Sequence, residues 1–219
     1  MQHQDLTQGS IPKLIRYLAV PASVGFLFNT LYNITDTYYA GLFSSLGQSA
    51  LSISFPVFFI IIAIGSGISS GTTALMGHAL GENNHRHAAS FAIQAISFAL
   101  IVGVLITILG YVISPFLFGI LGAQGNYLNL ALSYMNVLYL GAIFFTLTFT
   151  LNGILNAVGD TKSFSNVLIV GFFLNVVLSP AFMFGWSILP KLDLAGVAAA
   201  TLVTEFVTQA DPHSIWLSR

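Results

Sequence analysis

The chain contains six long apolar segments, and these constrain its fold more than any other feature of the sequence. They are separated by short polar or glycine-containing breaks and lie near residues 13–40, 51–80, 88–118, 127–156, 164–188 and 194–208. A helix needs about 20 apolar residues to cross a hydrocarbon core of about 30 Å, and the first five segments reach that length. We therefore predict an all-α polytopic membrane protein, folded as a six-helix transmembrane bundle over residues 13–208.

Composition supports this class and excludes others. Hydrophobic residues make up 56% of the 219 residues and charged residues only 6%, and the mean hydropathy is +0.87. A soluble domain carries about 25% charged residues. The net charge of −1 provides no basic surface for nucleic acid, and the absence of cysteine excludes disulfides and thiolate metal sites.

Basic residues are distributed unevenly between the two sides of the predicted bundle. One side has only Lys191, whereas the other has four basic residues: Lys13, Arg16, Arg86 and Lys162. Loops rich in lysine and arginine face the cytoplasm. We therefore expect a multi-pass protein of the cell (inner) membrane whose N-terminal residues 1–12 are cytoplasmic.

The sixth segment and the tail that follows it are atypical. Leu194 to Val207 is 14 residues, which as a helix is about 21 Å long and shorter than the hydrocarbon core. Asp211 and Pro212 would then end the helix within the membrane. This segment either ends its crossing early or does not cross, and residues 209–219 are expected to form an atypical C-terminal tail.

Asp36 is one of only two carboxylates within the predicted helices; the other is Glu205. A charged side chain near the bilayer centre costs about 2.5 to 3.5 kcal/mol, so it usually faces a cavity or binds a cation. An ion or proton site is therefore the first interpretation of Asp36. The alternative is a hydrated carboxylate near the membrane surface, because the polar stretch Ser44 to Ser49 begins eight residues later.

Other polar residues in the helices recur at helical spacing. Asn29, Asn33 and Asp36 lie at positions i, i+4 and i+7, which predicts a polar stripe lining a cavity. Pro21 in the same helix removes a backbone hydrogen bond and predicts either a hinge or a static kink. Further polar residues lie in the last three segments: Asn152, Asn156, Asn175, Ser179, Thr201 and Thr204. Single residues of this kind more often form interhelical hydrogen bonds than ion sites.

Two other functional classes receive little support. His78, His85 and His87 with Glu82 surround one loop, but this spacing favours a solvated loop over a metal site. No nucleophile with a base and no histidine–carboxylate pair lies within a helix, so we do not expect an enzyme. We expect no metal site and no cofactor.

Five motifs in order resemble the amino-terminal half of a MATE (multidrug and toxic-compound extrusion) transporter. Pro21 precedes the first of them; they are ITDTYYAG, GTTALMGHALGENN, LNGILNAVGDTK, FFLNVVLSPAFMFG and AGVAAATLVT. The resemblance covers about residues 10–207 and is strongest to the bacterial DinF-like branch. It implies one six-helix lobe of a two-lobe transporter.

The resemblance also implies a function and a site. Such proteins are antiporters, driven by H⁺ or Na⁺, that expel cationic lipophilic compounds from the cell. The family positions that form the coupling site match five residues here: Asp36, Asn152, Asn175, Ser179 and Thr201. Ser179 stands where the family often has an acid, which leaves one carboxylate in place of two. The choice between H⁺ and Na⁺ stays open, and Pro21 is expected to act as the hinge of the first helix.

The expected partners follow from the same resemblance. They are the lipid bilayer, cationic lipophilic small molecules, and either the missing carboxy-terminal lobe or a second copy of the chain. We expect the chain to insert but not to transport without a second lobe. The alternatives are a homodimeric half-transporter and a lipid-linked precursor flippase, although the flippase would need a cationic cavity, and only Arg16 lies within a helix.

Overall fold

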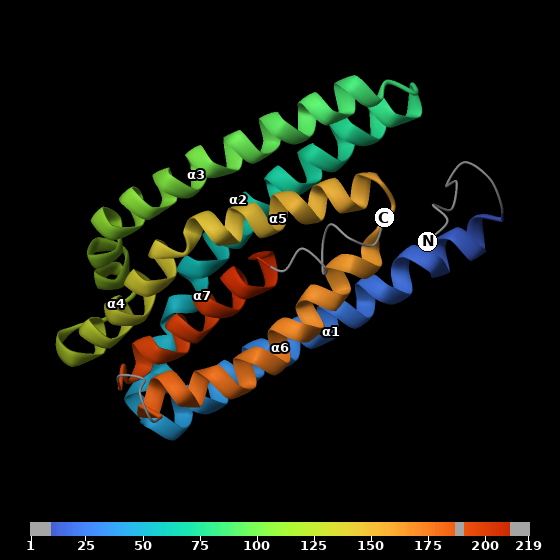
Figure 1. Ribbon diagram of the computed structural model, residues 1–219. Helices are drawn as coiled ribbons and strands as arrows, with labels where there is room; N and C mark the ends of the chain where they lie inside the picture. The colour runs from blue at the N-terminus through green and yellow to red at the C-terminus, as the bar shows by residue number, and fades with distance from the viewer. Residues whose placement is uncertain (1–9, 187–190, 211–219) are drawn as a thin grey trace.

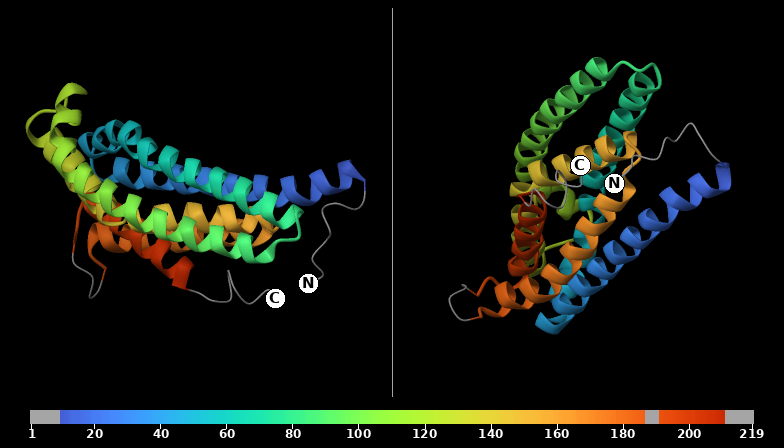
Figure 2. Two further views of the ribbon diagram at one scale, coloured as in Figure 1. Left: turned by 90° about the horizontal axis from the view of Figure 1, so that it is seen from above. Right: turned by 45° about the vertical axis from the view of Figure 1, so that its right-hand side comes forward.

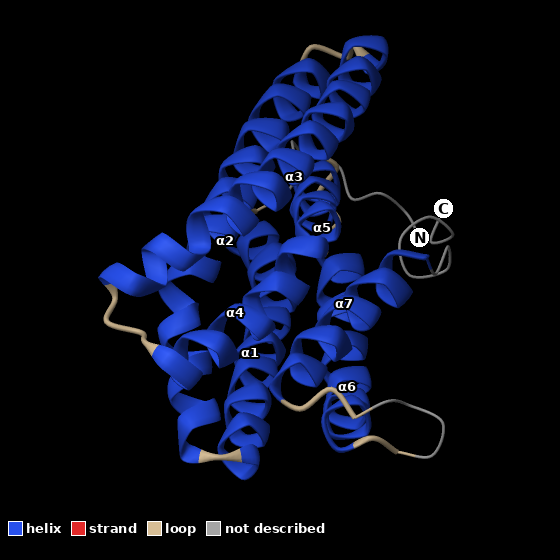
Figure 3. Ribbon diagram, turned by 90° about the vertical axis from the view of Figure 1, so that its left-hand side faces the viewer, coloured by secondary structure: helices blue, strands red, loops and turns tan. Residues whose placement is uncertain are grey.

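The computed structural model describes residues 10–186 and 191–210, and every regular element in these ranges is a helix (Figure 3). The helices are α1 (Ile11–Phe43), α2 (Ser45–Gly81), α3 (His85–Ile120), α4 (Gly125–Leu140), α5 (Ala142–Ala157), α6 (Thr161–Phe184) and α7 (Leu194–Ala210). This confirms the all-α class. The tail was expected at residues 209–219, but Gln209 and Ala210 belong to α7. Residues 211–219 and the N-terminal residues 1–9 lie outside the described residues.

Four helices, α1, α2, α3 and α6, are each long and apolar enough to cross a membrane. The pair α4 and α5 meets the same test when taken together, with a bend of 52° between them, and α7 is a shorter apolar helix. The helices run side by side as an elongated bundle (Figure 2). The protein is therefore a multi-pass membrane protein.

Two helix pairs organise the bundle (Figure 1). α1 packs along α6, and α2 packs along α5, with α3 covering both α2 and α5. α7 packs against α6 and α4. The main apolar core lies where all seven helices meet, and its fully buried side chains include Leu51, Phe118, Met135, Leu138, Met183 and Val197.

Local sequence accounts for several helix ends. The side chains of Ser44, Asn84 and Asp160 accept hydrogen bonds from backbone N–H groups three residues later, which caps α2, α3 and α6. Gly185 ends α6 in the left-handed conformation, at φ 74°. The helix predicted over 164–188 therefore ends at Phe184, and the stretch predicted as a break after residue 40 is helical except at Ser44.

The helix predicted over 127–156 is broken at Gly141 into α4 and α5. Leu202 of α7 occupies the break, because its Cδ2 atom fills the space that a Cβ atom on Gly141 would need. Two side chains of α3 bond backbone carbonyls of α4: Thr107 donates to Tyr139 at 2.7 Å and Tyr111 donates to Asn136 at 2.8 Å. The bend is thus contacted by α7, which is distant in the sequence, and by α3, which directly precedes α4.

Candidate functional site

Close packing between α1 and α6 positions Asp36. Gly25 is buried in this contact, and a Cβ atom there would lie 3.0 Å from the Cα atom of Ser165. Further along α1, Tyr39 donates a hydrogen bond from its hydroxyl to the Val176 carbonyl at 3.0 Å. The two helices therefore stay in contact on both sides of Asp36, which directs its side chain into the lobe.

Asp36 is buried, with 5% of its surface exposed, and two side chains of α6 donate to it. The Asn175 Nδ2 atom lies 3.0 Å from the Asp36 Oδ1 atom, and the Ser179 hydroxyl lies 3.4 Å from the same oxygen. Both donors are fully buried and one helical turn apart. The structure thus brings three of the five predicted coupling residues into contact, and Asp36 is not a hydrated carboxylate at a surface.

Thr201 of α7 faces the same region. Its side chain is buried and donates to the Val197 carbonyl at 3.1 Å, and it lies within interaction range of Asp36. The hydroxyl of Tyr32, one turn before Asp36 on α1, lies close to Thr201 and Asn175 as well. Sequence reasoning missed Tyr32, although its i, i+4 spacing from Asp36 placed it on the same face of the helix.

Three buried oxygen atoms near this site have no hydrogen-bond partner among the described residues. They are the Tyr32 hydroxyl, the Asn175 Oδ1 atom and the Thr204 hydroxyl. Leaving a buried polar atom unpaired costs about 1–3 kcal/mol, so such atoms call for an explanation. A carboxylate can accept a proton, and a carboxylate surrounded by neutral oxygen atoms can also provide the ligands for a monovalent cation.

The other predicted residues lie elsewhere. Asn152 is half-buried on α5 and, within the described part of the chain, makes no hydrogen bond to Asp36. Asn29 is exposed, and its carbonyl accepts a hydrogen bond from the Asn33 side chain at 2.8 Å. The predicted stripe is therefore divided, since Asp36 is enclosed within the lobe whereas Asn29 is open to the surroundings.

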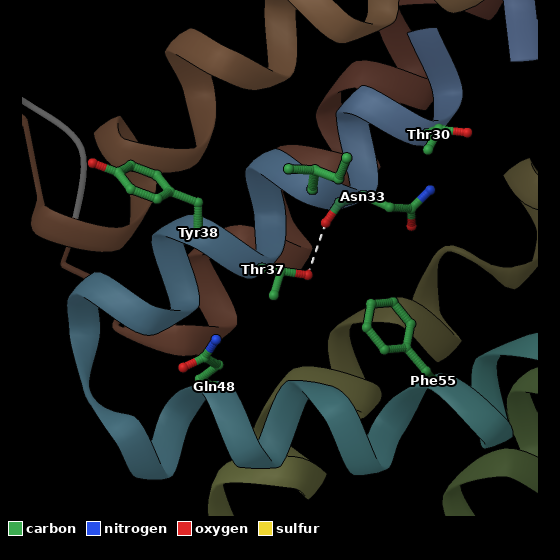
Figure 4. Close-up of a pocket in the computed structure, with 7 residues that line it drawn as sticks. Thr30, Asn33, Thr37, Tyr38, Gln48 and Phe55 are labelled. Atoms are coloured by element: carbon green, nitrogen blue, oxygen red, sulfur yellow. Dashed lines mark hydrogen bonds between the residues drawn. The ribbon is translucent and has the colours of Figure 1, made fainter. Parts of the chain in front are cut away.

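Asn33 instead lines an open groove of about 400 Å³ between α1 and α2 (Figure 4). The Thr37 hydroxyl donates to the Asn33 carbonyl at 2.9 Å. The lining combines neutral polar and apolar side chains: Thr30, Asn33, Ile34, Thr37, Tyr38, Gln48 and Phe55. Asp36 is not among the residues that line it, so the groove and the Asp36 site occupy different faces of α1.

The histidine-containing loop is solvated. His78 and Glu82 approach to 3.6 Å with both side chains mostly exposed, and His85 and His87 are exposed. Within residues 10–186 and 191–210 there is no group of three histidine, aspartate or glutamate side chains that could hold a metal ion.

Comparison with known proteins links this fold to membrane transport. The profile of the MatE family matches residues 21–181. The chain is 28% identical over 202 residues to the FAD transporter of Shewanella oneidensis, which covers 92% of the chain and 45% of that protein. It is also 28% identical over 198 residues to the probable multidrug resistance protein NorM of Thermotoga maritima, which covers 90% of the chain and 42% of that protein.

Among solved structures, the chain matches a multidrug resistance MATE family transporter in an outward-facing conformation. The TM-score is 0.89 at 30% sequence identity, and the match covers 100% of this chain and 48% of that one. The chain therefore spans about half the length, or slightly less, of the relatives it matches.

Proposed function

Because the chain belongs to the MATE family of membrane transporters, we propose that it forms the amino-terminal lobe of a cation-coupled antiporter in which Asp36 binds the coupling ion. The family consists of transporters and not of enzymes. Asp36, Asn175, Ser179 and Thr201 are the residues of this site, and the coupling ion is H⁺ or Na⁺. The lobe lies in the cell membrane with its N-terminus in the cytoplasm.

The observation that carries this proposal is the buried carboxylate of Asp36, which receives two neutral donors and no cationic one. Among the described residues, neither of the two ion pairs includes Asp36. A buried ionised carboxylate without a cationic partner is costly, so such groups become neutral or bind a cation. Asp36 thus has two states, empty and occupied, and an antiporter needs a group of this kind.

Antiport follows if the two states favour different arrangements of the lobe. A ligand shifts a conformational equilibrium only through its differential affinity for the two conformations. A bound cation neutralises or balances the charge of Asp36 and reduces the need for the Asn175 and Ser179 donors, so α1 can move relative to α6. The cation would then bind from outside the cell and be released into the cytoplasm, and this would drive expulsion of the substrate.

Pro21 is the proposed hinge of this motion. Proline has no N–H group, so the α1 turn before it loses one helical hydrogen bond. The Thr161 hydroxyl at the start of α6 donates to the Leu18 carbonyl in this turn at 3.1 Å, and Lys162 lies over the ring of Tyr17 at 4.7 Å. α6 thus holds α1 before Pro21 and contacts Asp36 beyond it, and bending at Pro21 would separate these two contacts.

Cationic lipophilic compounds are the proposed substrates. The groove between α1 and α2 combines apolar and neutral polar side chains and contains no basic residue. Arg16 is exposed near the start of α1, so it provides no enclosed positive site. A lipid-linked pyrophosphate needs such a site, and the flippase alternative therefore receives less support than drug export.

The chain spans less than half of the two curated relatives, so we propose that transport requires a second lobe. This is a carboxy-terminal lobe or, in the alternative of a homodimer, a second copy of the chain. The open groove is the proposed surface toward that lobe, because its polar side chains lie on membrane-spanning helices and would be costly against lipid.

Drug efflux from cells that lack their own pumps tests the proposal. Three proteins are compared: the 219-residue chain, the chain extended by the carboxy-terminal lobe of a full-length relative, and the extended protein with Asp36→Asn. We expect resistance from the extended protein only, and its loss in the variant. Resistance from the unextended chain would favour the homodimer, whereas full activity of the Asp36→Asn variant would refute the coupling role.

A further inference from the structure

Glu205 is the second carboxylate in the apolar helices, and the site described above leaves it unassigned. It lies on α7, four residues after Thr201, and therefore on the same face of that helix. The Thr148 hydroxyl of α5 donates to the Glu205 Oε2 atom at 2.7 Å. Gln209 donates to the same Thr148 hydroxyl at 2.6 Å and to the Phe144 carbonyl at 3.0 Å. Glu205 is thus held in place between α5 and α7.

No cationic side chain neutralises Glu205 among the described residues, whose two ion pairs lie elsewhere. The helices α4, α5 and α7 contain no lysine, arginine or histidine. On the remaining helices packed against α7, Lys13 and Arg16 are exposed on α1, and Lys162 of α6 lies over the ring of Tyr17. The donors of Glu205 are all neutral, as are those of Asp36.

A buried tyrosine hydroxyl lies near both acids. The Tyr32 hydroxyl has no hydrogen-bond partner within the described part of the chain, and it lies within electrostatic range of both Asp36 and Glu205. Thr201, one turn before Glu205, lies close to Tyr32 and to Asp36. Tyr32 of α1 and Thr201 of α7 therefore lie in the region between Asp36 and Glu205.

We propose that Glu205 is a second binding position for the coupling cation, linked to Asp36 through Tyr32 and Thr201. The inference rests on the proposed coupling role of Asp36. Each ionised carboxylate lowers the potential at the other, because charges in a weakly polar interior interact more strongly than in water. A monovalent cation, whether H⁺ or Na⁺, therefore binds more tightly at Asp36 when Glu205 is ionised. The role of Thr148 is to hold Glu205 in the required orientation.

Infrared difference spectroscopy of the full 219-residue chain in lipid bilayers tests this proposal, because carboxyl and carboxylate groups have separate bands. One arm changes pH without Na⁺, and the other adds Na⁺ at constant pH, so the two cations are distinguished. We expect Asp36→Asn and Glu205→Gln each to remove a different part of the signal. We also expect Glu205→Gln to weaken cation binding at Asp36 by about 5-fold or more, in the range typical of coupled sites.

Glu82→Gln is the matched control, because Glu82 is exposed and lies at the turn after α2. It should leave the Asp36 signal unchanged. Thr148→Val keeps both carboxylates and removes the donor to Glu205, so it should alter the Glu205 signal more than the Asp36 signal. If Glu205→Gln does not yield folded protein, Thr148→Val and Glu205→Asp provide the same comparison.

The outcomes separate this inference from the function on which it rests. In one outcome, Asp36→Asn removes a cation-dependent signal but Glu205→Gln changes nothing. Glu205 is then not a cation-binding position, and the Asp36 site stands. The same conclusion holds if the pair Thr148→Val and Glu205→Asp is used in place of Glu205→Gln and changes nothing. If Asp36→Asn itself changes nothing, the proposed coupling role fails, and the inference fails with it.

Discussion

Two faces of α1 differ in what they present, although they belong to one helix. The inner face directs Asp36 to Asn175 and Ser179 of α6, where the carboxylate is 5% exposed. The outer face directs Asn33 and its neighbours to the open groove beside α2 (Figure 4). On the enclosed face, two fixed donors hold the carboxylate in place, and its burial favours binding of a cation. The groove instead offers neutral polar and apolar groups. We infer that the inner face binds the ion and the outer face the substrate.

The largest expected effect comes from removing the charge of the inner face. Asp36→Asn keeps the size and polarity of the side chain but can neither take up a proton nor attract a cation. We expect complete loss of ion-driven transport in the extended two-lobe protein, measured as drug uptake into proteoliposomes under a pH or Na⁺ gradient. Asp193→Asn, at an exposed ion pair with Lys191, is the control and should retain transport. Equal activity of the two variants would contradict the division between the faces.

Removing one donor of the inner face should strengthen ion binding. Asn175→Ala deletes the 3.0 Å hydrogen bond to Asp36, which stabilises the empty, ionised carboxylate. Hydrogen bonds to charged groups contribute about 1.5–3 kcal/mol, so the affinity for the coupling ion is expected to rise by roughly 10- to 100-fold. Titration of transport against the driving ion measures this shift. Thr37→Ala, which removes a hydroxyl from the groove, should not shift the ion dependence, and an equal shift in both variants would refute the prediction.

Two glycines of α1 allow a matched comparison of packing. A Cβ atom on Gly25 would lie 3.0 Å from the Ser165 backbone of α6, whereas on Gly41 it would meet only the Gln48 side chain, at 3.5 Å. Overpacking costs about 1–3 kcal/mol. We therefore expect Gly25→Ala to lower the thermal stability of the purified chain in detergent and to strengthen ion binding, because α1 must move away from the α6 donors that stabilise the ionised Asp36. Gly41→Ala should change neither property.

The sequence indicated much of this arrangement, and its failures have physical causes. Hydrophobic segment lengths indicated the all-α membrane class, because each helix must satisfy its backbone within the bilayer. Motif resemblance selected Asp36, Asn175 and Ser179, which do meet in the structure. Helical spacing alone grouped Asn29 and Asn33 with Asp36, but spacing places residues on a face of one helix and does not state which neighbour covers that face.

Other differences depend on contacts between distant segments. The bend at Gly141 involves the side chain of Leu202 on α7, and no pattern within residues 127–156 reports that contact. Asn152 shares helical spacing with Asn156, yet its position on α5 leaves it without a hydrogen bond to Asp36 in the described structure. Tyr32 was the omission that could have been avoided, since it precedes Asp36 by one turn. In the sequence alone, a tyrosine near a membrane carboxylate is interpreted as apolar packing. The structure is needed to show that its hydroxyl is buried.

The smallest expected effect comes from a substitution in the groove, which tests the outer face of α1. Among the described residues, the Asn33 side chain donates its hydrogen bond to the Asn29 carbonyl of its own helix, so Asn33→Ala removes no hydrogen bond between helices there. Substitutions of this kind usually change stability by no more than about 0.5 kcal/mol. We expect thermal stability and ion dependence to stay the same, while the relative resistance to different drugs changes, because Asn33 is part of the groove lining. Resistance profiles of the extended protein with and without the substitution measure this. A uniform loss of resistance to all drugs, together with a changed ion dependence, would mean that the two faces of α1 act as one site.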